Sequence, residues 1–154
     1  MLEILRTDTS NPDFIDLVKS LDNYLKITDG DEHAFYNQFN GLNVINQVIV
    51  AYFNSIPVAC GAFKPTDTNS VEIKRMYTIP EARGKGIAGD VLKALEIWAK
   101  ERGYRYAVLE TGTRQVEAVQ FYKKCGYTII TNYGPYKNMK NSICYKKDLD
   151  EKTL

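Results

Sequence analysis

Residues that bind metals are scarce in this chain of 154 residues, which contains one histidine and three cysteines. Cys60, Cys125 and Cys144 do not have the spacing of metal ligands, which argues against a structural zinc site. Because Cys60 and Cys144 stand in apolar, strand-like runs, we expect them to be buried free thiols. Long apolar spans and a signal-peptide pattern are also missing, so we expect a cytoplasmic protein without a membrane span.

Neither sign of charge prevails, because the net charge is +1. The total therefore implies neither a nucleic-acid nor a membrane partner. Residues 1–40 nevertheless hold eight acidic against three basic side chains, a net of −5, which leaves +6 for the rest. This asymmetry suits a site that takes a cation from one side and a polyanion from the other, although solvated faces explain it equally well. The length and a hydrophobic content of 44% predict a single domain over residues 1–154.

The most informative stretch is Arg-Gly-Lys-Gly-Ile-Ala at residues 83–88, between a predicted strand at 71–77 and a helix that runs to about Gly103. Where a strand turns through glycines into a helix, unpaired backbone amides and the positive end of the helix dipole point the same way. Gly84 and Gly86 let the backbone approach an anion closely, and the two basic side chains of the stretch add positive charge. A ligand that carries phosphate or pyrophosphate is therefore expected here.

Two other phosphate-binding loops compare less well with this stretch. The longer loop of the nucleotide triphosphatases, Gly-x-x-x-x-Gly-Lys-Ser/Thr, does not occur. Gly84, Gly86 and Gly89 do fit the dinucleotide pattern Gly-x-Gly-x-x-Gly by spacing. That pattern, however, belongs early in a βαβ unit, and here it lies mid-chain. Glu110, at the end of the next predicted strand, keeps a dinucleotide as a minor alternative.

The hydrophobic pattern predicts a mixed α/β sheet with helices on its faces, in the order β-α-α-β-β-β-α-β-α-β-β. Asn11 and Pro12 mark the start of the first helix, and Asp29-Gly30 its end. Asn54-Ser55 predicts a tight hairpin. Strands are expected at 2–6, 47–53, 56–63, 71–77, 106–110, 128–131 and 142–147, and the later helices at 32–40, 87–103 and 115–124.

This order, together with two segments of the sequence, resembles the GNAT superfamily of acyl-CoA N-acyltransferases. Residues 83–88 match its signature Arg/Gln-x-x-Gly-x-Gly/Ala, and residues 118–127 match its helix signature Ala-x-x-x-Tyr-x-x-x-Gly-Phe/Tyr. The resemblance implies a GNAT-like sheet whose central strands splay apart around acetyl-CoA. It further implies an N-acetyltransferase that transfers the acetyl group directly to a primary amine in a ternary complex.

The resemblance also implies roles for individual residues. Tyr122 would protonate the departing thiolate, although a core tyrosine on an amphipathic helix is the alternative. Glu72, eleven residues before Arg83, would be the base, a ligand of the acceptor amine, or an ion-pair partner of Lys74 or Arg75. Gln115 stands where relatives often have asparagine, and either contacts the CoA arm or caps its helix. The positions assigned to acetyl-CoA are Met76, Tyr77, Thr78, Arg83, Gly84, Lys85, Gly86, Ile87, Ala88, Gln115 and Tyr122.

The acceptor is expected between the first helices and the last hairpin, where acids and tyrosines suit a small cationic amine. The candidate contacts are Tyr24, Glu32, Tyr36, Glu72 and Tyr133, with Asp29, Asp31, His33 and Tyr136 nearby in sequence. Each tyrosine is alternatively a packing residue. A polyamine, an amino acid amide, an aminoglycoside and a protein lysine all remain open, and so does a homodimer. The alternative to an enzyme is an acyl-CoA-binding sensor whose catalysis has lapsed.

Overall fold

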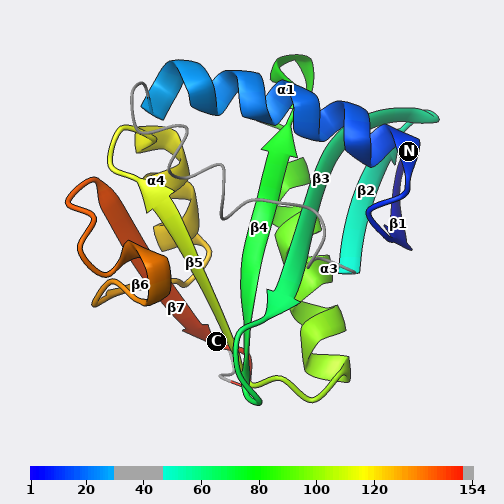
Figure 1. Ribbon diagram of the computed structural model, residues 1–154. Helices are drawn as coiled ribbons and strands as arrows, with labels where there is room; N and C mark the ends of the chain where they lie inside the picture. The colour runs from blue at the N-terminus through cyan, green and yellow to red at the C-terminus, as the bar shows by residue number, and fades with distance from the viewer. Residues whose placement is uncertain (30–46, 151–154) are drawn as a thin grey trace.

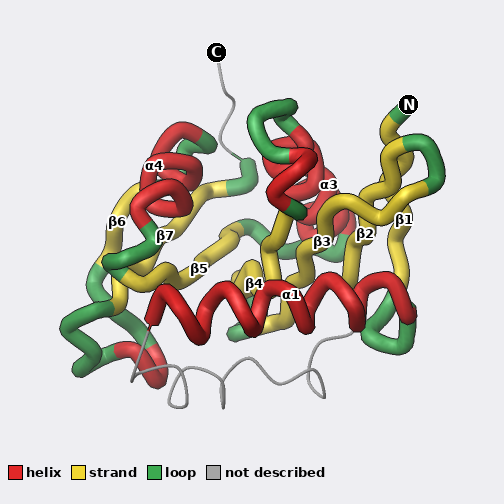
Figure 2. The backbone as a smooth tube through the Cα atoms, turned by 90° about the horizontal axis from the view of Figure 1, so that it is seen from above, coloured by secondary structure: helices red, strands yellow, loops and turns green. Residues whose placement is uncertain are grey.

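The computed structural model describes residues 1–29 and 47–150. These residues form a seven-stranded sheet in the order β1-β2-β3-β4-β5-β7-β6. Figure 2 shows α1 on one face of the sheet and both α3 and α4 on the other. The strands are β1 (Leu2–Thr7), β2 (Gln47–Phe53), β3 (Ile56–Pro65), β4 (Ser70–Thr78), β5 (Tyr106–Gly112), β6 (Thr128–Ile130) and β7 (Ser142–Asp148). The helices are α1 (Pro12–Asp29), α3 (Ile87–Glu101) and α4 (Val116–Lys124), with short 3-10 turns at Pro80–Ala82 and Gly134–Tyr136. The helix predicted at 32–40 lies outside the described residues.

Helix α1 begins where the sequence predicts. The Asn11 side-chain oxygen accepts hydrogen bonds from the amides of Asp13 and Phe14 at 2.9 and 3.1 Å. This caps two of the amides that a helix start leaves unpaired. Phe14, Leu17 and Val18 then pack on β2 and β3 in one apolar cluster. The predicted start of this helix is thus confirmed.

The first four strands form an antiparallel meander. Asn54 and Ser55 join β2 to β3 with φ values of 51° and 68°, the left-handed pair that suits the twist of a two-residue hairpin. The predicted tight hairpin is therefore confirmed.

A larger core lies between the sheet and α3, where Val91 and Leu95 of α3 are fully buried. Gly61 in β3 lets α3 approach the sheet closely. A Cβ atom at Gly61 would lie 2.5 Å from the Met76 sulfur and 2.8 Å from Leu95 Cδ1. Any side chain at this position would therefore force the Met76 and Leu95 side chains to shift.

The sheet splits between β4 and β5. These parallel strands pair only at Ser70–Tyr106, Val71–Ala107 and Glu72–Val108, although β4 continues to Thr78 and β5 to Gly112. Figure 1 shows the two strands separating toward α1. The predicted mixed sheet with splayed central strands is confirmed. Beyond Glu72, the edge of β4 that faces β5 has no neighbouring strand, although its other edge still pairs with β3.

The cysteines are as the sequence predicts. All three cysteines are free, and both Cys60 and Cys144 are buried. Within residues 1–29 and 47–150, no helix is both long and apolar enough to cross a membrane.

Candidate active site

A cavity of about 120 Å³ opens at the split between β4 and β5. Its lining comes from both faces of the sheet. Leu21 and Leu25 of α1 contribute from one face, and Gln115 and Tyr122 from the α4 side. Residues 72–76 of β4 and 109–111 of β5 form its walls. A molecule on the α1 face and a molecule on the α4 face can therefore meet through the sheet.

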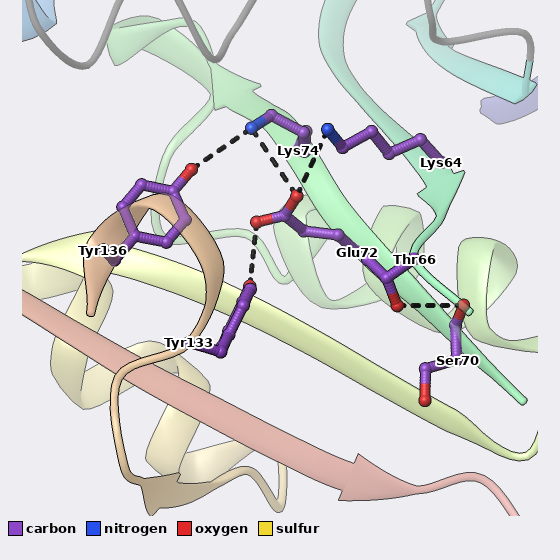
Figure 3. Close-up of polar contacts among 7 residues, drawn as sticks. All are labelled: Lys64, Thr66, Ser70, Glu72, Lys74, Tyr133 and Tyr136. Atoms are coloured by element: carbon purple, nitrogen blue, oxygen red, sulfur yellow. Dashed lines mark hydrogen bonds and ion pairs between the residues drawn. The ribbon is translucent and has the colours of Figure 1, made fainter.

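A polar cluster stands on the α1 face of β4, drawn in Figure 3. Glu72 is only 4% exposed, and the Tyr133 hydroxyl donates to its Oε2 at 2.8 Å. Its other oxygen lies 3.7 Å from both Lys74 Nζ and Lys64 Nζ. The Lys74 ammonium also donates to the Tyr136 hydroxyl at 3.4 Å. The cluster holds the Glu72 carboxylate at a fixed place in the cavity wall.

The environment fixes the protonation of these neighbours. Burial, followed by the charge of Glu72, raises the pKa of Tyr133, so its phenol remains a donor. Burial lowers the pKa of Lys74, while the Glu72 carboxylate opposes that shift. The sequence left open an ion pair of Glu72 with Lys74 or with Arg75. The structure contains the pair with Lys74, whereas Arg75 pairs with Asp22.

On the opposite face, Tyr122 of α4 is buried and its ring packs edge-on against Tyr127 at 5.9 Å. No described residue forms a hydrogen bond with the Tyr122 hydroxyl. Burial raises the pKa of Tyr122, which keeps the phenol protonated near neutral pH. Tyr122 can therefore supply a proton to a group in the cavity.

The glycine loop precedes α3 with Gly84 and Gly86 both at φ 79°. No side chain caps α3, and the first amide to donate within the helix is that of Asp90. Among the described residues, nothing accepts a hydrogen bond from the amides of 84–89. Cβ atoms built on Gly84 and Gly86 would meet nothing within 4 Å. This row of free amides at a helix start fits a pyrophosphate group, and with it the CoA part of acetyl-CoA.

Arg83, at the start of this loop, is turned back toward the sheet. Its Nε donates to the Thr78 carbonyl oxygen at 2.9 Å, and its guanidinium lies 5.8 Å from the ring centres of both Tyr24 and Tyr77. Tyr24, predicted as an acceptor contact, therefore lies beside the glycine loop and not in the cavity wall. Tyr133 does not line the cavity either, but its hydroxyl bonds Glu72, which does.

The other predicted residues lie in four places. Met76, Tyr77 and Thr78 form the end of β4, beyond its pairing with β5. Gln115 lines the cavity and is the N-cap residue of α4, where its carbonyl oxygen accepts from the Val119 amide at 3.0 Å, but its side chain makes no capping hydrogen bond. Lys85 lies 5.9 Å from the Phe53 ring, while Ile87 and Ala88 form the first turn of α3. Glu32 and Tyr36, like Asp31 and His33, lie outside the described residues, and Asp29 is described only as the end of α1.

Sequence reasoning missed the environment of Arg75. This residue sits in a bulge, where the β3–β4 register shifts opposite Gly61 and its φ is 59°. Its Nη2 donates to Asp22 of α1 at 2.7 Å, while Nε and Nη1 are buried without a partner among the described residues. Each such donor costs about 1–3 kcal/mol. Strand alternation predicts that Lys74 shares a face with Glu72, but no pattern in the sequence marks the bulge.

A metal centre is not found in the part of the chain that the structure describes, since no three His, Cys, Asp or Glu side chains gather there. The cavity itself presents carboxylate, ammonium and phenol groups from β4, α4 and the segment before β7.

Comparison with known proteins agrees with this geometry. The acetyltransferase (GNAT) family matches residues 11–127, a range that contains the glycine loop, both strands beside the split and α4. IAA acetyltransferase of Azospirillum brasilense is 31% identical over 141 residues, which cover 88% of this chain and 90% of that protein.

Solved structures share the fold. A Klebsiella pneumoniae protein assigned as an acyl-CoA N-acyltransferase superimposes with a TM-score of 0.82 at 26% identity, covering 97% of this chain and 98% of that one. A GNAT family acetyltransferase from Elizabethkingia anophelis, solved with acetyl-CoA bound, gives a TM-score of 0.70 at 21% identity over 96% of this chain and 97% of its own.

Proposed function

The chain belongs to the acetyltransferase (GNAT) family and is an acyl-CoA-dependent N-acetyltransferase, and from this premise we propose that it acetylates a primary amine of a small molecule by direct attack in a ternary complex. The observation that carries the proposal is the cavity through the split sheet. It is lined by Glu72 on the α1 face and by Tyr122 on the α4 side. One reactant can reach it from each face.

Acetyl-CoA would bind on the glycine-loop side of the split. The free amides of 84–89 would hold its pyrophosphate, with Gly84 and Gly86 giving close access. The edge of β4 that β5 leaves unpaired would take the amides of the pantetheine arm, as an added strand does. The Elizabethkingia relative, which binds acetyl-CoA in the same fold, supports this assignment.

Two groups of the protein would then act at the thioester of acetyl-CoA. The Met76 amide would donate to its carbonyl oxygen as negative charge develops there, an effect worth about 2.7–4 kcal/mol in other enzymes. Tyr122 would give its proton to the departing CoA sulfur, and burial keeps its phenol protonated until that step.

Glu72 would receive the proton of the attacking amine, directly or through one water molecule. Its Oε2 is held by Tyr133 and its Oε1 lies between two lysines. The acceptor would arrive as an ammonium ion attracted by the carboxylates of Glu72 and Glu110 in the cavity wall. It would lose one proton to solvent to become the nucleophile and give the second to Glu72 on attack. A cationic amine therefore matches the reacting end of the acceptor.

The test is release of CoA thiol from acetyl-CoA against a panel of polyamines, amino acids, amino acid amides, aminoglycosides and lysine peptides. We expect release with small amines, and much slower release in Glu72→Gln at unchanged acetyl-CoA affinity. If no amine of the panel causes thiol release while calorimetry detects acetyl-CoA binding, the result would contradict the proposed transfer and favour a sensor. Release with lysine peptides alone would instead identify a protein acetyltransferase.

A further inference from the structure

Arg75 presents hydrogen-bond donors that the folded chain does not use. Its side chain lines the cavity and is 2% exposed. One nitrogen, Nη2, is paired with Asp22, while Nε and Nη1 are buried without a partner among the described residues. Buried guanidinium donors are nearly always satisfied in native proteins. An acceptor group that the described chain does not contain would satisfy them.

The backbone at Arg75 is also held in an uncommon conformation. Its φ of 59° is unusual for a residue with a side chain. The bulge opposite Gly61 places two residues of β4 where one would stand, and the Cys60 thiol donates to the Arg75 carbonyl oxygen at 3.3 Å. Bulges of this kind re-aim a side chain next to a site. Here the bulge sends Arg75 toward α1 and Met76 toward the core beneath α3.

We propose that Arg75 binds a carboxylate of the acceptor, so that the substrate is an amino acid or a molecule with the same amine and carboxylate pair. This inference rests on the proposed function. A carboxylate is the planar anion that a guanidinium fork recognises best. The other cation among the residues that line the cavity, Lys74, is already engaged with Glu72.

The position of Arg75 limits the size of such a molecule. Arg75 directly precedes Met76, whose amide would hold the thioester carbonyl, and neighbouring Cα atoms are about 3.8 Å apart. The guanidinium lies at the end of the Arg75 side chain in the same cavity wall, so the attacking amine and the bound carboxylate would belong to one small molecule. An amino acid carries both groups, and a polyamine has no carboxylate.

A purely structural ion pair is the competing explanation. An ion pair between α1 and β4 needs only Nη2 and Asp22, whose side chain is 36% exposed. It gives no reason for two further buried donors on a strained residue at the cavity wall. The two explanations differ in what removal of each partner does to substrate selection.

The experiment compares matched amines in the thiol-release assay: several amino acids, their carboxamides and the corresponding decarboxylated amines. Wild type should use the acids with kcat/KM at least 10-fold above the carboxamides. Arg75→Gln should lower kcat/KM for the acids by about 10- to 100-fold and leave the carboxamides within about twofold. Asp22→Asn, which breaks the same ion pair but keeps the guanidinium, should retain the preference. Equal use of all three amine classes by wild type, or an equal loss on all of them in Arg75→Gln, would overturn the inference.

A binding measurement separates this inference from the transferase proposal. With CoA present, N-acetyl amino acids should raise the Tm of wild type and of Asp22→Asn, but not of Arg75→Gln, whereas N-acetyl carboxamides should raise none. Arg75-dependent carboxylate binding without any thiol release would reject the proposed reaction and support the carboxylate site. Thiol release without carboxylate binding would reject the site alone.

Discussion

Gly86→Glu should abolish acetyl-CoA binding while destabilising the fold no more than a matched change at the far end of α3. Gly86 has φ 79°, and a Cβ there would meet nothing within 4 Å. Gly103 has φ 92° and the same open surroundings. It follows the carboxyl end of α3, about 22 Å away for a helix of 15 residues. Gly103→Glu thus adds the same side chain and a similar backbone strain away from the loop.

The two variants should lose a similar amount of folding stability. Only Gly86→Glu should also lose binding free energy for acetyl-CoA. A side chain at left-handed φ costs about 1–2 kcal/mol, which lowers the Tm of a domain of this size by roughly 2–8 °C. A carboxylate about 5 Å from one pyrophosphate charge adds about 3 kcal/mol of repulsion at an effective dielectric constant of 20. That corresponds to more than a 100-fold loss of affinity.

Titration calorimetry with acetyl-CoA, together with thermal unfolding of both variants, makes the comparison. We expect similar Tm values, near-normal binding in Gly103→Glu and no detectable binding in Gly86→Glu. Gly86→Ala, which adds the strain and a Cβ but no charge, should lose less affinity for acetyl-CoA than Gly86→Glu. If Gly86→Glu binds acetyl-CoA within threefold of wild type, the loop is not the pyrophosphate site and the reasoning fails.

Three further predictions concern other parts of the molecule. Tyr122→Phe should lower kcat by about 10²-fold or more with acetyl-CoA affinity within twofold; unchanged kcat would remove Tyr122 from the reaction. Gly61→Ala should lower the Tm by roughly 2–10 °C, because its Cβ would lie 2.5 Å from the Met76 sulfur. Gly89→Ala, whose Cβ would meet open space, should leave the Tm unchanged. Burial raises the pKa of Cys60 to about 12 and that of Cys144 to about 11, so both stay protonated at pH 8. A disulfide reagent should then label one native thiol, Cys125, and three after unfolding; fast labelling of all three in native protein would contradict this burial.

The sequence predicts those elements whose signals are local. The Asn11 cap, the Asn54-Ser55 hairpin and the helix after the glycine loop each depend on a few neighbouring residues, and each forms where expected. Resemblance to a family, and not periodicity, predicted the split between β4 and β5. Hydrophobic patterns carry no information on which strand pairs end early.

Features that depend on register were not predictable in the same way. Lys64 reaches Glu72 because these residues face each other across β3 and β4. The bulge at Arg75 breaks the alternation that would have placed its side chain on the opposite face. A one-residue shift of this kind leaves no mark in the amino-acid pattern.

The acidic character of the first 40 residues is partly explained by local contacts. Asp13 accepts a hydrogen bond from the Tyr52 hydroxyl at 2.7 Å, and Asp22 pairs with Arg75. Asp8 accepts from the Ser10 amide at 2.9 Å. These acidic side chains therefore make local contacts that stabilise the fold. The negative charge of this region alone does not identify a cationic acceptor.

Direct transfer through the split sheet is tested most directly by initial velocities measured over a grid of acetyl-CoA and amine concentrations, with the protein mass recorded after incubation in acetyl-CoA alone. A ternary complex predicts double-reciprocal lines that intersect and a protein mass without an added acetyl group. Parallel lines together with an acetylated protein would show that the acetyl group passes through a residue of the chain, and would contradict direct attack by the amine.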